Sequence, residues 1–264
     1  NQAFILANHR LARKQLVHFC QPASTGVKHV DHFLIGNMVH ENGTAANQYS
    51  EKLVKLEGSG LCFDLHTRSS ETNTQISREM LGIRNNTTMF ISGANFFKII
   101  PELRYIWAKI ISKVPDSKLV LYPFGPAWSN SYPKYAFINA IEDVFQKHHV
   151  SKERLVVIEP LPDRGNIISL LRCADVYLDA VPYSGATSLL DPLEAGVPPV
   201  VVQGDKLRFN QGAAILKDLG VSELVAKNGT EYMHLALMLA HDKAFRSRVR
   251  HAISTKMQER PRFL

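Results

Sequence analysis

Cysteine is scarce in this chain of 264 residues, which holds only Cys20, Cys62 and Cys173. These three are scattered, no metal-ligand spacing links them, and an odd number argues against a disulfide framework. No apolar run approaches the roughly 20 residues that span a membrane, and no basic segment followed by an apolar leader opens the chain. The sequence therefore favours a cytoplasmic protein without membrane spans.

Blocks of like charge are also missing, although the formal net charge is +7. A basic excess can attract nucleic acid, anionic membranes or anionic small molecules. The lysines and arginines are dispersed, so a soluble basic surface explains the charge best, and an anionic ligand is compatible with it. Nucleic-acid binding would need a basic stripe with exposed aromatic residues, for which Trp128 and Tyr132 are the only candidates. We expect neither a nucleic-acid nor a membrane partner.

From residue 89 onward the chain alternates regularly between short apolar runs and amphipathic stretches. The runs that indicate strands cover residues 89–93, 118–124, 154–161, 175–181, 198–204 and 222–226. The stretches that indicate helices cover residues 101–115, 133–150, 166–174, 186–196, 211–220 and 231–260, the last as two segments. Apolar strands separated by helices predict a parallel sheet covered on both faces. Residues 81–264 are thus expected to form one complete, doubly wound, Rossmann-like α/β domain with about six strands.

Residues 1–80 follow a different pattern. Strand-like runs at 14–20, 31–36 and 51–56 alternate with turns and polar loops, and no long helix follows the first dozen residues. Three strands with so little helix to cover them resemble the end of another α/β domain whose front is missing. The polar segment 68–78 is the expected linker between the two.

A polar break, PYSGATS, follows the strand expected at 175–181. In open parallel sheets ligands bind outside the carboxyl ends of the strands. Helix N-termini at that edge offer unpaired amides and a partial positive charge to phosphate. Gly185 lets the backbone approach a ligand, Ser184 can cap the helix, and Thr187 and Ser188 add hydroxyl donors. We interpret this break as a binding loop for a nucleoside diphosphate.

Asp191 lies one helical turn after Thr187, on the same helix face. Its carboxylate would repel phosphate but can accept hydrogen bonds from a ribose. The alternative is that the break is an ordinary helix start, and that Asp191, directly before Pro192, belongs to a structural turn.

A second loop of this kind, SGANFFKIIP, follows the first expected strand of the domain. Lys98 would supply positive charge to a phosphate and Asn95 an amide. The alternative is that Lys98 is an ordinary surface lysine.

Residues 92–124, 174–205 and 212–226, taken together, resemble the O-linked N-acetylglucosamine transferase family, which is glycosyltransferase family 41, in its bacterial branch. Residues 9–36 and 48–58 resemble the end of that family's first catalytic lobe. The resemblance implies a GT-B architecture, in which two Rossmann-like lobes face each other across a cleft and the nucleotide sugar binds mainly to the C-terminal lobe.

The resemblance also implies a function. An inverting, metal-independent enzyme would move a sugar, GlcNAc or a hexose, from a UDP-sugar to a protein side chain. Lys98 matches the catalytic lysine that contacts the donor diphosphate, and Asn95 stands near the nucleotide. Thr187 and Ser188, after Gly185, match hydroxyl residues that bind the diphosphate, and Asp191 matches the aspartate that holds the ribose.

Two histidines of the animal enzymes are absent here, since Ala186 stands at one position and the other would lie near Ile167. Their absence leaves the base contacts and the donor open, with Asp163 or Arg164 as candidates for polar contacts near the uracil.

The family's catalytic histidines in the first lobe would lie before residue 1, and the resemblance leaves room for helical repeats upstream of them. His9 and His18 are instead expected to be structural. No Asp-x-Asp pair stands in a loop, so no metal is expected. A module that binds UDP-sugar or protein without catalysis is the alternative function.

Overall fold

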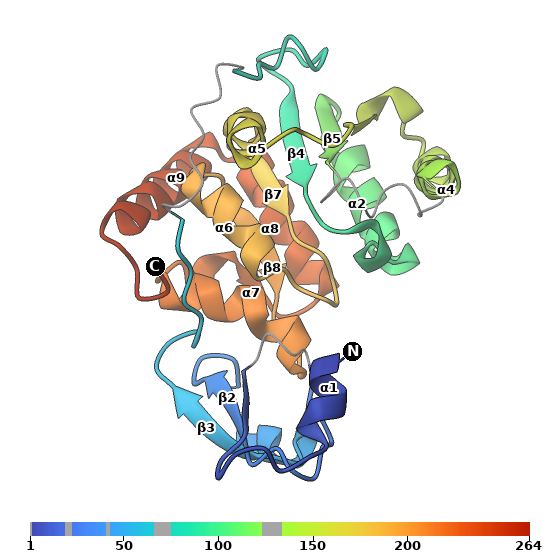
Figure 1. Cartoon of the computed structure of the whole chain (residues 1–264). Helices are drawn as coiled ribbons and strands as arrows, with labels where there is room; N and C mark the ends of the chain where they lie inside the picture. The colour runs from blue at the N-terminus through green and yellow to red at the C-terminus, as the bar shows by residue number, and fades with distance from the viewer. Residues whose placement is uncertain (1, 19–22, 41–42, 66–74, 123–133) are drawn as a thin grey trace.

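The computed structural model describes residues 2–18, 23–40, 43–65, 75–122 and 134–264 (Figure 1). The strands are β1 Leu16–His18, β2 His32–Gly36, β3 Lys52–Leu56, β4 Thr88–Ser92, β5 Ser117–Leu121, β6 Leu155–Val157, β7 Val176–Leu178, β8 Pro199–Val202 and β9 Val225–Ala226. The helices are α1 Gln2–Ala7, α2 Pro101–Lys113, α4 Lys134–Lys147, α5 Arg164–Arg172, α6 Thr187–Glu194, α7 Leu207–Asp218, α8 Gly229–His241 and α9 Lys243–Gln258. Short 3₁₀ turns cover Gly43–Gln48, Phe96–Lys98, Lys152–Arg154 and Ser222–Leu224. Cys20, Trp128, Tyr132 and residues 68–74 of the expected linker lie outside the described residues.

The larger sheet has the strand order β6-β5-β4-β7-β8-β9, and its strands pair in parallel. When the six strands are numbered by their order in the chain, they lie across the sheet in the order 3-2-1-4-5-6. This is the strand order of the doubly wound nucleotide-binding fold. All residues of β7 and all but the first residue of β4 are buried because helices cover both faces of the sheet, as Figure 1 shows. The predicted α/β class and the parallel Rossmann-like sheet are confirmed.

Several element boundaries differ from the prediction, and two of them lie near the end of the larger sheet. The strand expected at 222–226 is shorter, because Ser222–Leu224 forms a 3₁₀ turn and only Val225–Ala226 pairs with β8. Helix α7 begins at Leu207, before the predicted start at residue 211. The helical end of the chain does divide in two, at Asp242, whose side chain caps α9.

The smaller sheet, in order β1-β2-β3, is also parallel. The segment after it is joined to the larger unit by hydrogen bonds that two of its backbone amides donate. The Ser59 amide donates to Asp218 at 2.8 Å, and the Phe63 amide donates to the Phe263 carbonyl at 2.8 Å. The boundary between residues 80 and 81 stays a prediction.

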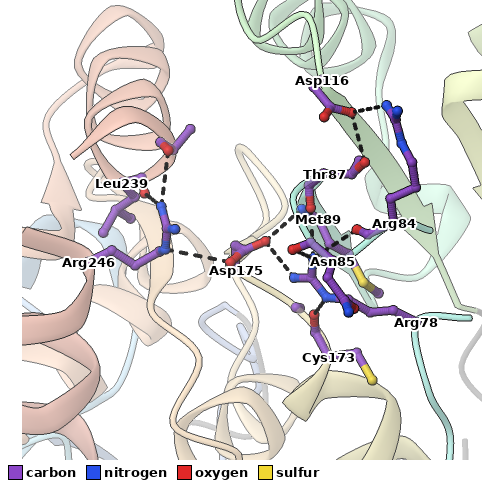
Figure 2. Close-up of polar contacts among 12 residues, drawn as sticks. Arg78, Arg84, Asn85, Thr87, Met89, Asp116, Cys173, Asp175, Leu239 and Arg246 are labelled. Carbon is purple, nitrogen blue, oxygen red and sulfur yellow. Dashed lines mark hydrogen bonds and ion pairs between the residues drawn. The ribbon is translucent and has the colours of Figure 1, made fainter. Parts of the chain in front are cut away.

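The chain before β4 is held at the amino edge of the larger sheet by an ion-pair network around Asp175, shown in Figure 2. The Arg78 guanidinium pairs with Asp175 at 2.7 Å and donates to the carbonyl of Cys173. Asp175 also accepts from the Met89 amide at 2.8 Å and faces Arg246 at 3.6 Å. Since Asp175 precedes β7, this network lies at the edge opposite to the carboxyl ends of the strands.

None of the helices in the described ranges is both long and apolar enough to cross a membrane.

Candidate functional site

Two loops leave the carboxyl edge of the larger sheet side by side. Strands β4 and β7 are hydrogen-bonded neighbours, with Phe90 opposite Val176. The chain turns to one side of the sheet after β4 and to the other after β7, so the place between their loops is the topological switch point of the fold. Ligands of open α/β sheets bind at such a point. The two loops singled out in the sequence are therefore the two that border this switch point.

Lys98 ends the short 3₁₀ turn after β4 and reaches across to the loop after β7. Its Nζ lies 3.4 Å from the Ser184 carbonyl oxygen and 4.1 Å from the centre of the Tyr183 ring. Burial lowers the pKa of Lys98, while the negative charge of Asp179 opposes this shift. Lys98 is thus a half-buried cation between the two loops and not a fully solvent-exposed lysine.

Asp179, directly after β7, was not among the predicted site residues, yet it organises the loop. It is 1% exposed. Its carboxylate accepts from the Ser184 hydroxyl at 2.6 Å and from the Gly185 amide at 3.0 Å. Burial raises the pKa of Asp179, and these hydrogen bonds together with the charge of Lys98 oppose the rise. The available signal was a carboxylate at the end of an otherwise apolar strand, since acidic residues are rarely buried without partners.

The predicted cap of helix α6 is wrong. Ser184 is fully buried and donates its hydroxyl to Asp179, so it does not cap the helix. The N-cap residue is Ala186, which provides no side-chain hydrogen bond. The first-turn amides of a helix have no intrahelical acceptor. The Leu189 amide donates to the Ala186 carbonyl at 3.0 Å, which leaves the amides of the exposed Thr187 and the half-buried Ser188 for a ligand.

Asp191 lies inside α6 and is 8% exposed, so its assignment to a turn is wrong. Its Oδ1 accepts from Arg164 Nε at 2.8 Å, and the same guanidinium pairs with Glu194. Burial raises the pKa of Asp191, and Arg164 opposes that rise. The sequence named Arg164 as a candidate contact but did not predict its pairing with Asp191.

Two other predicted polar residues have local structural roles. Asn95 begins the 3₁₀ turn of Lys98, where its side-chain oxygen accepts from the Phe97 amide at 3.0 Å. Asp163 caps α5 by accepting from the Asn166 amide at 3.0 Å. Asn95 still lies within three residues of Lys98, whereas the Asp163 carboxylate bonds to its own helix.

His18 makes a contact within the smaller unit, where its Nε2 lies 3.2 Å from the Gly60 carbonyl oxygen. Among the described residues there is no group of three or more His, Cys, Asp or Glu side chains that could hold a metal ion.

Comparison with known proteins gives consistent results. The family model described as Glycosyl transferase family 41 matches residues 66–263. The chain is 30% identical over 255 residues to the probable UDP-N-acetylglucosamine--peptide N-acetylglucosaminyltransferase SPINDLY of Petunia hybrida, covering 96% of this chain and 26% of that protein. The protein of the same description from Solanum lycopersicum is also 30% identical, over 253 residues, with the same two shares. The chain thus spans about a quarter of the length of these relatives.

A solved structure of a Thermobaculum terrenum O-GlcNAc transferase mutant superposes with a TM-score of 0.80 at 25% identity, covering 95% of this chain and 45% of that one. The lipopolysaccharide glycosyltransferase WaaG superposes with a TM-score of 0.60 at 14% identity, covering 92% of this chain and 61% of that one, and shows the fold alone.

Proposed function

Because the chain belongs to glycosyltransferase family 41, we propose that it supplies the donor-binding lobe of an inverting, metal-independent enzyme that moves GlcNAc or a hexose from a UDP-sugar to a protein side chain. The observation that carries the proposal is the meeting of Lys98 with the loop after β7 at the switch point. The proposal includes a cytoplasmic setting, which the few scattered cysteines favour.

The binding mode follows from the distribution of charge along α6. The diphosphate lies at the start of the helix, where Thr187, Ser188 and the uncapped amides donate hydrogen bonds and Lys98 adds a positive charge. The ribose lies one turn along, beside the Asp191 carboxylate. The pairing of Asp191 with Arg164 fits this role, because the guanidinium offsets the repulsion between the carboxylate and a nearby phosphate.

The reaction is a single displacement. An acceptor hydroxyl, or an asparagine amide, attacks the anomeric carbon, and the bond from that carbon to the β-phosphate oxygen breaks. The electron pair of this bond leaves with UDP. Negative charge then develops on the diphosphate, and Lys98, the two hydroxyls and the helix amides stabilise it as fixed donors. The proton of the acceptor passes to a general base, and no residue of this chain is assigned that role.

The experiment that tests the proposal is calorimetry with UDP and UDP-GlcNAc on the complete protein, alongside a transfer assay. We expect the protein to bind UDP, and Lys98→Ala to weaken UDP binding at least about tenfold, as the loss of a charged hydrogen bond implies. Transfer should be lost in this variant. Lys113→Ala, which removes an exposed lysine at the end of α2, is the matched control.

Near-normal transfer by Lys98→Ala would remove Lys98 from the site. Binding of UDP-sugar by the wild-type protein without any transfer would instead favour a non-catalytic binding module.

A further inference from the structure

The Lys98 ammonium packs against the ring of Tyr183. The Lys98 Nζ lies 4.1 Å from the centre of the Tyr183 ring, well inside the range at which an aromatic face attracts a cation. The Ser184 carbonyl oxygen, 3.4 Å from Nζ, adds a second attraction from the next residue of the same loop. Two neighbouring residues of one loop, Tyr183 through its ring face and Ser184 through its carbonyl, thus attract the same cation.

The backbone around Tyr183 is fixed, so the ring is presented from a rigid loop. Next to it, the Ser184 amide donates to the Arg208 carbonyl at 3.0 Å. The Ser184 hydroxyl donates to Asp179 and accepts from the Gly212 amide at 3.1 Å. The residue after Tyr183 is therefore bonded both to α7 and to Asp179, the residue that follows β7.

Lysine alone would not keep this position. Its side chain has four rotatable bonds, and ordering it at the moment when a ligand binds costs conformational entropy. A lysine already held beside the phosphate site avoids most of that cost. Cation–π contact suits this purpose, because it restrains the ammonium without neutralising its charge as a carboxylate partner would.

We propose that Tyr183 is a positioning residue that holds the Lys98 ammonium at the diphosphate-binding loop through the face of its aromatic ring. The inference rests on the proposed function, since it is the donor diphosphate that the positioned ammonium serves. Asp179, behind the loop, is the charged group whose field favours the protonated form of Lys98. Tyr183 thus determines the position of the ammonium, and Asp179 stabilises its positive charge.

A double-mutant cycle on the complete protein tests the inference, with UDP affinity from calorimetry as the readout. We expect Tyr183→Leu to weaken UDP binding about three- to tenfold, the range that a cation–π contact of this kind supports. Tyr183→Phe keeps the ring and should restore the affinity to within about twofold of the wild-type value. In the Lys98→Met background, Tyr183→Leu should have no further effect, because the group that it positions is gone.

Equal losses from Tyr183→Leu in both backgrounds would overturn the inference, since Tyr183 would then act on the nucleotide or the loop directly. Thermal unfolding of the Leu and Phe variants checks that both fold alike.

A second measurement needs no nucleotide and separates this inference from the proposed function. Limited acetylation followed by mass spectrometry reports how fast Lys98 reacts relative to Lys113. Removing the ring uncovers Nζ, so Lys98 should react at least about threefold faster in Tyr183→Leu than in Tyr183→Phe, the size of the lost contact. Equal rates in the two variants would overturn the inference even if UDP binds. Failure of the wild-type protein to bind UDP would overturn the proposed function, while the acetylation rates still decide whether Tyr183 holds Lys98.

Discussion

At the residue scale, the charge of Lys98 determines how the site responds to pH. Burial places the pKa of Lys98 below the 10.5 of a free lysine. The ammonium is the useful form, so activity should be fully present at neutral pH and should fall as pH rises through this lowered pKa. The alkaline limb of kcat/KM, which reports groups of the free enzyme, should therefore have its midpoint below 10.5.

The Lys98→Arg variant serves as the control for this limb, because a guanidinium stays charged throughout the range. Whatever activity it retains should show no alkaline decline in that window. If kcat/KM of Lys98→Arg falls at alkaline pH as it does in the wild-type protein, another group is responsible for the titration.

Gly185 provides a second prediction at this scale, which concerns space rather than charge. A Cβ at this position would lie 2.4 Å from Ser188 Oγ and 3.0 Å from Asp179 Oδ1. Gly185→Ala must therefore displace the Ser188 side chain or the loop itself, and we expect a loss of about 1–3 kcal/mol in the free energy of unfolding together with weaker UDP binding. Denaturant unfolding and calorimetry measure the two effects.

Gly82→Ala is the matched control. Gly82 has a φ of +62°, and a Cβ added there would meet no atom within 4 Å, so the substitution strains the backbone without a clash and far from the site. It should lower stability by about 1 kcal/mol and leave UDP affinity unchanged. Loss of UDP affinity in both variants would show that stability, not loop shape, limits binding.

At the element scale, helix α6 carries two acidic residues with different expected roles. Asp191 is 8% exposed and faces the nucleoside end of the proposed site, whereas Glu194 is exposed. Asp191→Asn removes a charged acceptor, so UDP binding should weaken by about tenfold, the equivalent of one charged hydrogen bond. Glu194→Gln removes the other partner of Arg164 and should change UDP affinity by less than about threefold, as expected of an exposed ion pair. Calorimetry measures the UDP affinity of both variants. Equal losses of affinity would mean that the ribose does not bind beside Asp191.

The sequence predicted whole elements better than it predicted side-chain partners. The strands of the larger sheet are continuous apolar runs, and this pattern is enough to identify a parallel sheet and the loops at its carboxyl edge. It also predicted that the loop of Lys98 and the loop before α6 lie at the same edge of the sheet, where Lys98 does contact the Ser184 carbonyl. Ser184 was assigned the wrong role, because its actual acceptor, Asp179, becomes a partner only when the loop folds back over the end of β7.

The pairing of Arg164 with Asp191 was missed for the same kind of reason. The two residues belong to helices from different crossovers, and α5 and α6 come together only in the packed fold. Spacing along a chain reports neighbours on one helix or strand, whereas contacts between crossovers depend on the complete tertiary arrangement.

At the scale of the whole molecule, the two sheets are joined through Asp218 at the end of α7. Its side chain is 4% exposed. It accepts from the Ser59 amide at 2.8 Å, and Ser59 is itself fully buried. Asp218→Ala leaves that amide buried without an acceptor, so the free energy of unfolding should fall by about 1–3 kcal/mol.

Guanidinium unfolding measures this loss. Glu223→Ala, which removes a loose pair with Arg248 at 3.8 Å, should cost less than about 1 kcal/mol, as exposed pairs do. A result in which the two variants are equally stable would mean that the contact through Asp218 does not hold the smaller sheet to the larger one.

The charge of the departing diphosphate leads to a prediction about the whole reaction. Transferases neutralise this charge either with a bound divalent metal or with fixed protein donors. Here the proposed donors are the Lys98 ammonium, the hydroxyls of Thr187 and Ser188, and the amides at the start of α6, all of which belong to the protein itself. Transfer measured in excess EDTA should therefore proceed within about twofold of the untreated rate, since fixed donors need no exchangeable ion. Added Mg²⁺ should likewise fail to restore Lys98→Ala, because the lost charge is part of the protein. Complete loss of transfer in EDTA, with recovery on adding Mg²⁺, would mean that a metal and not Lys98 carries the charge of the leaving group.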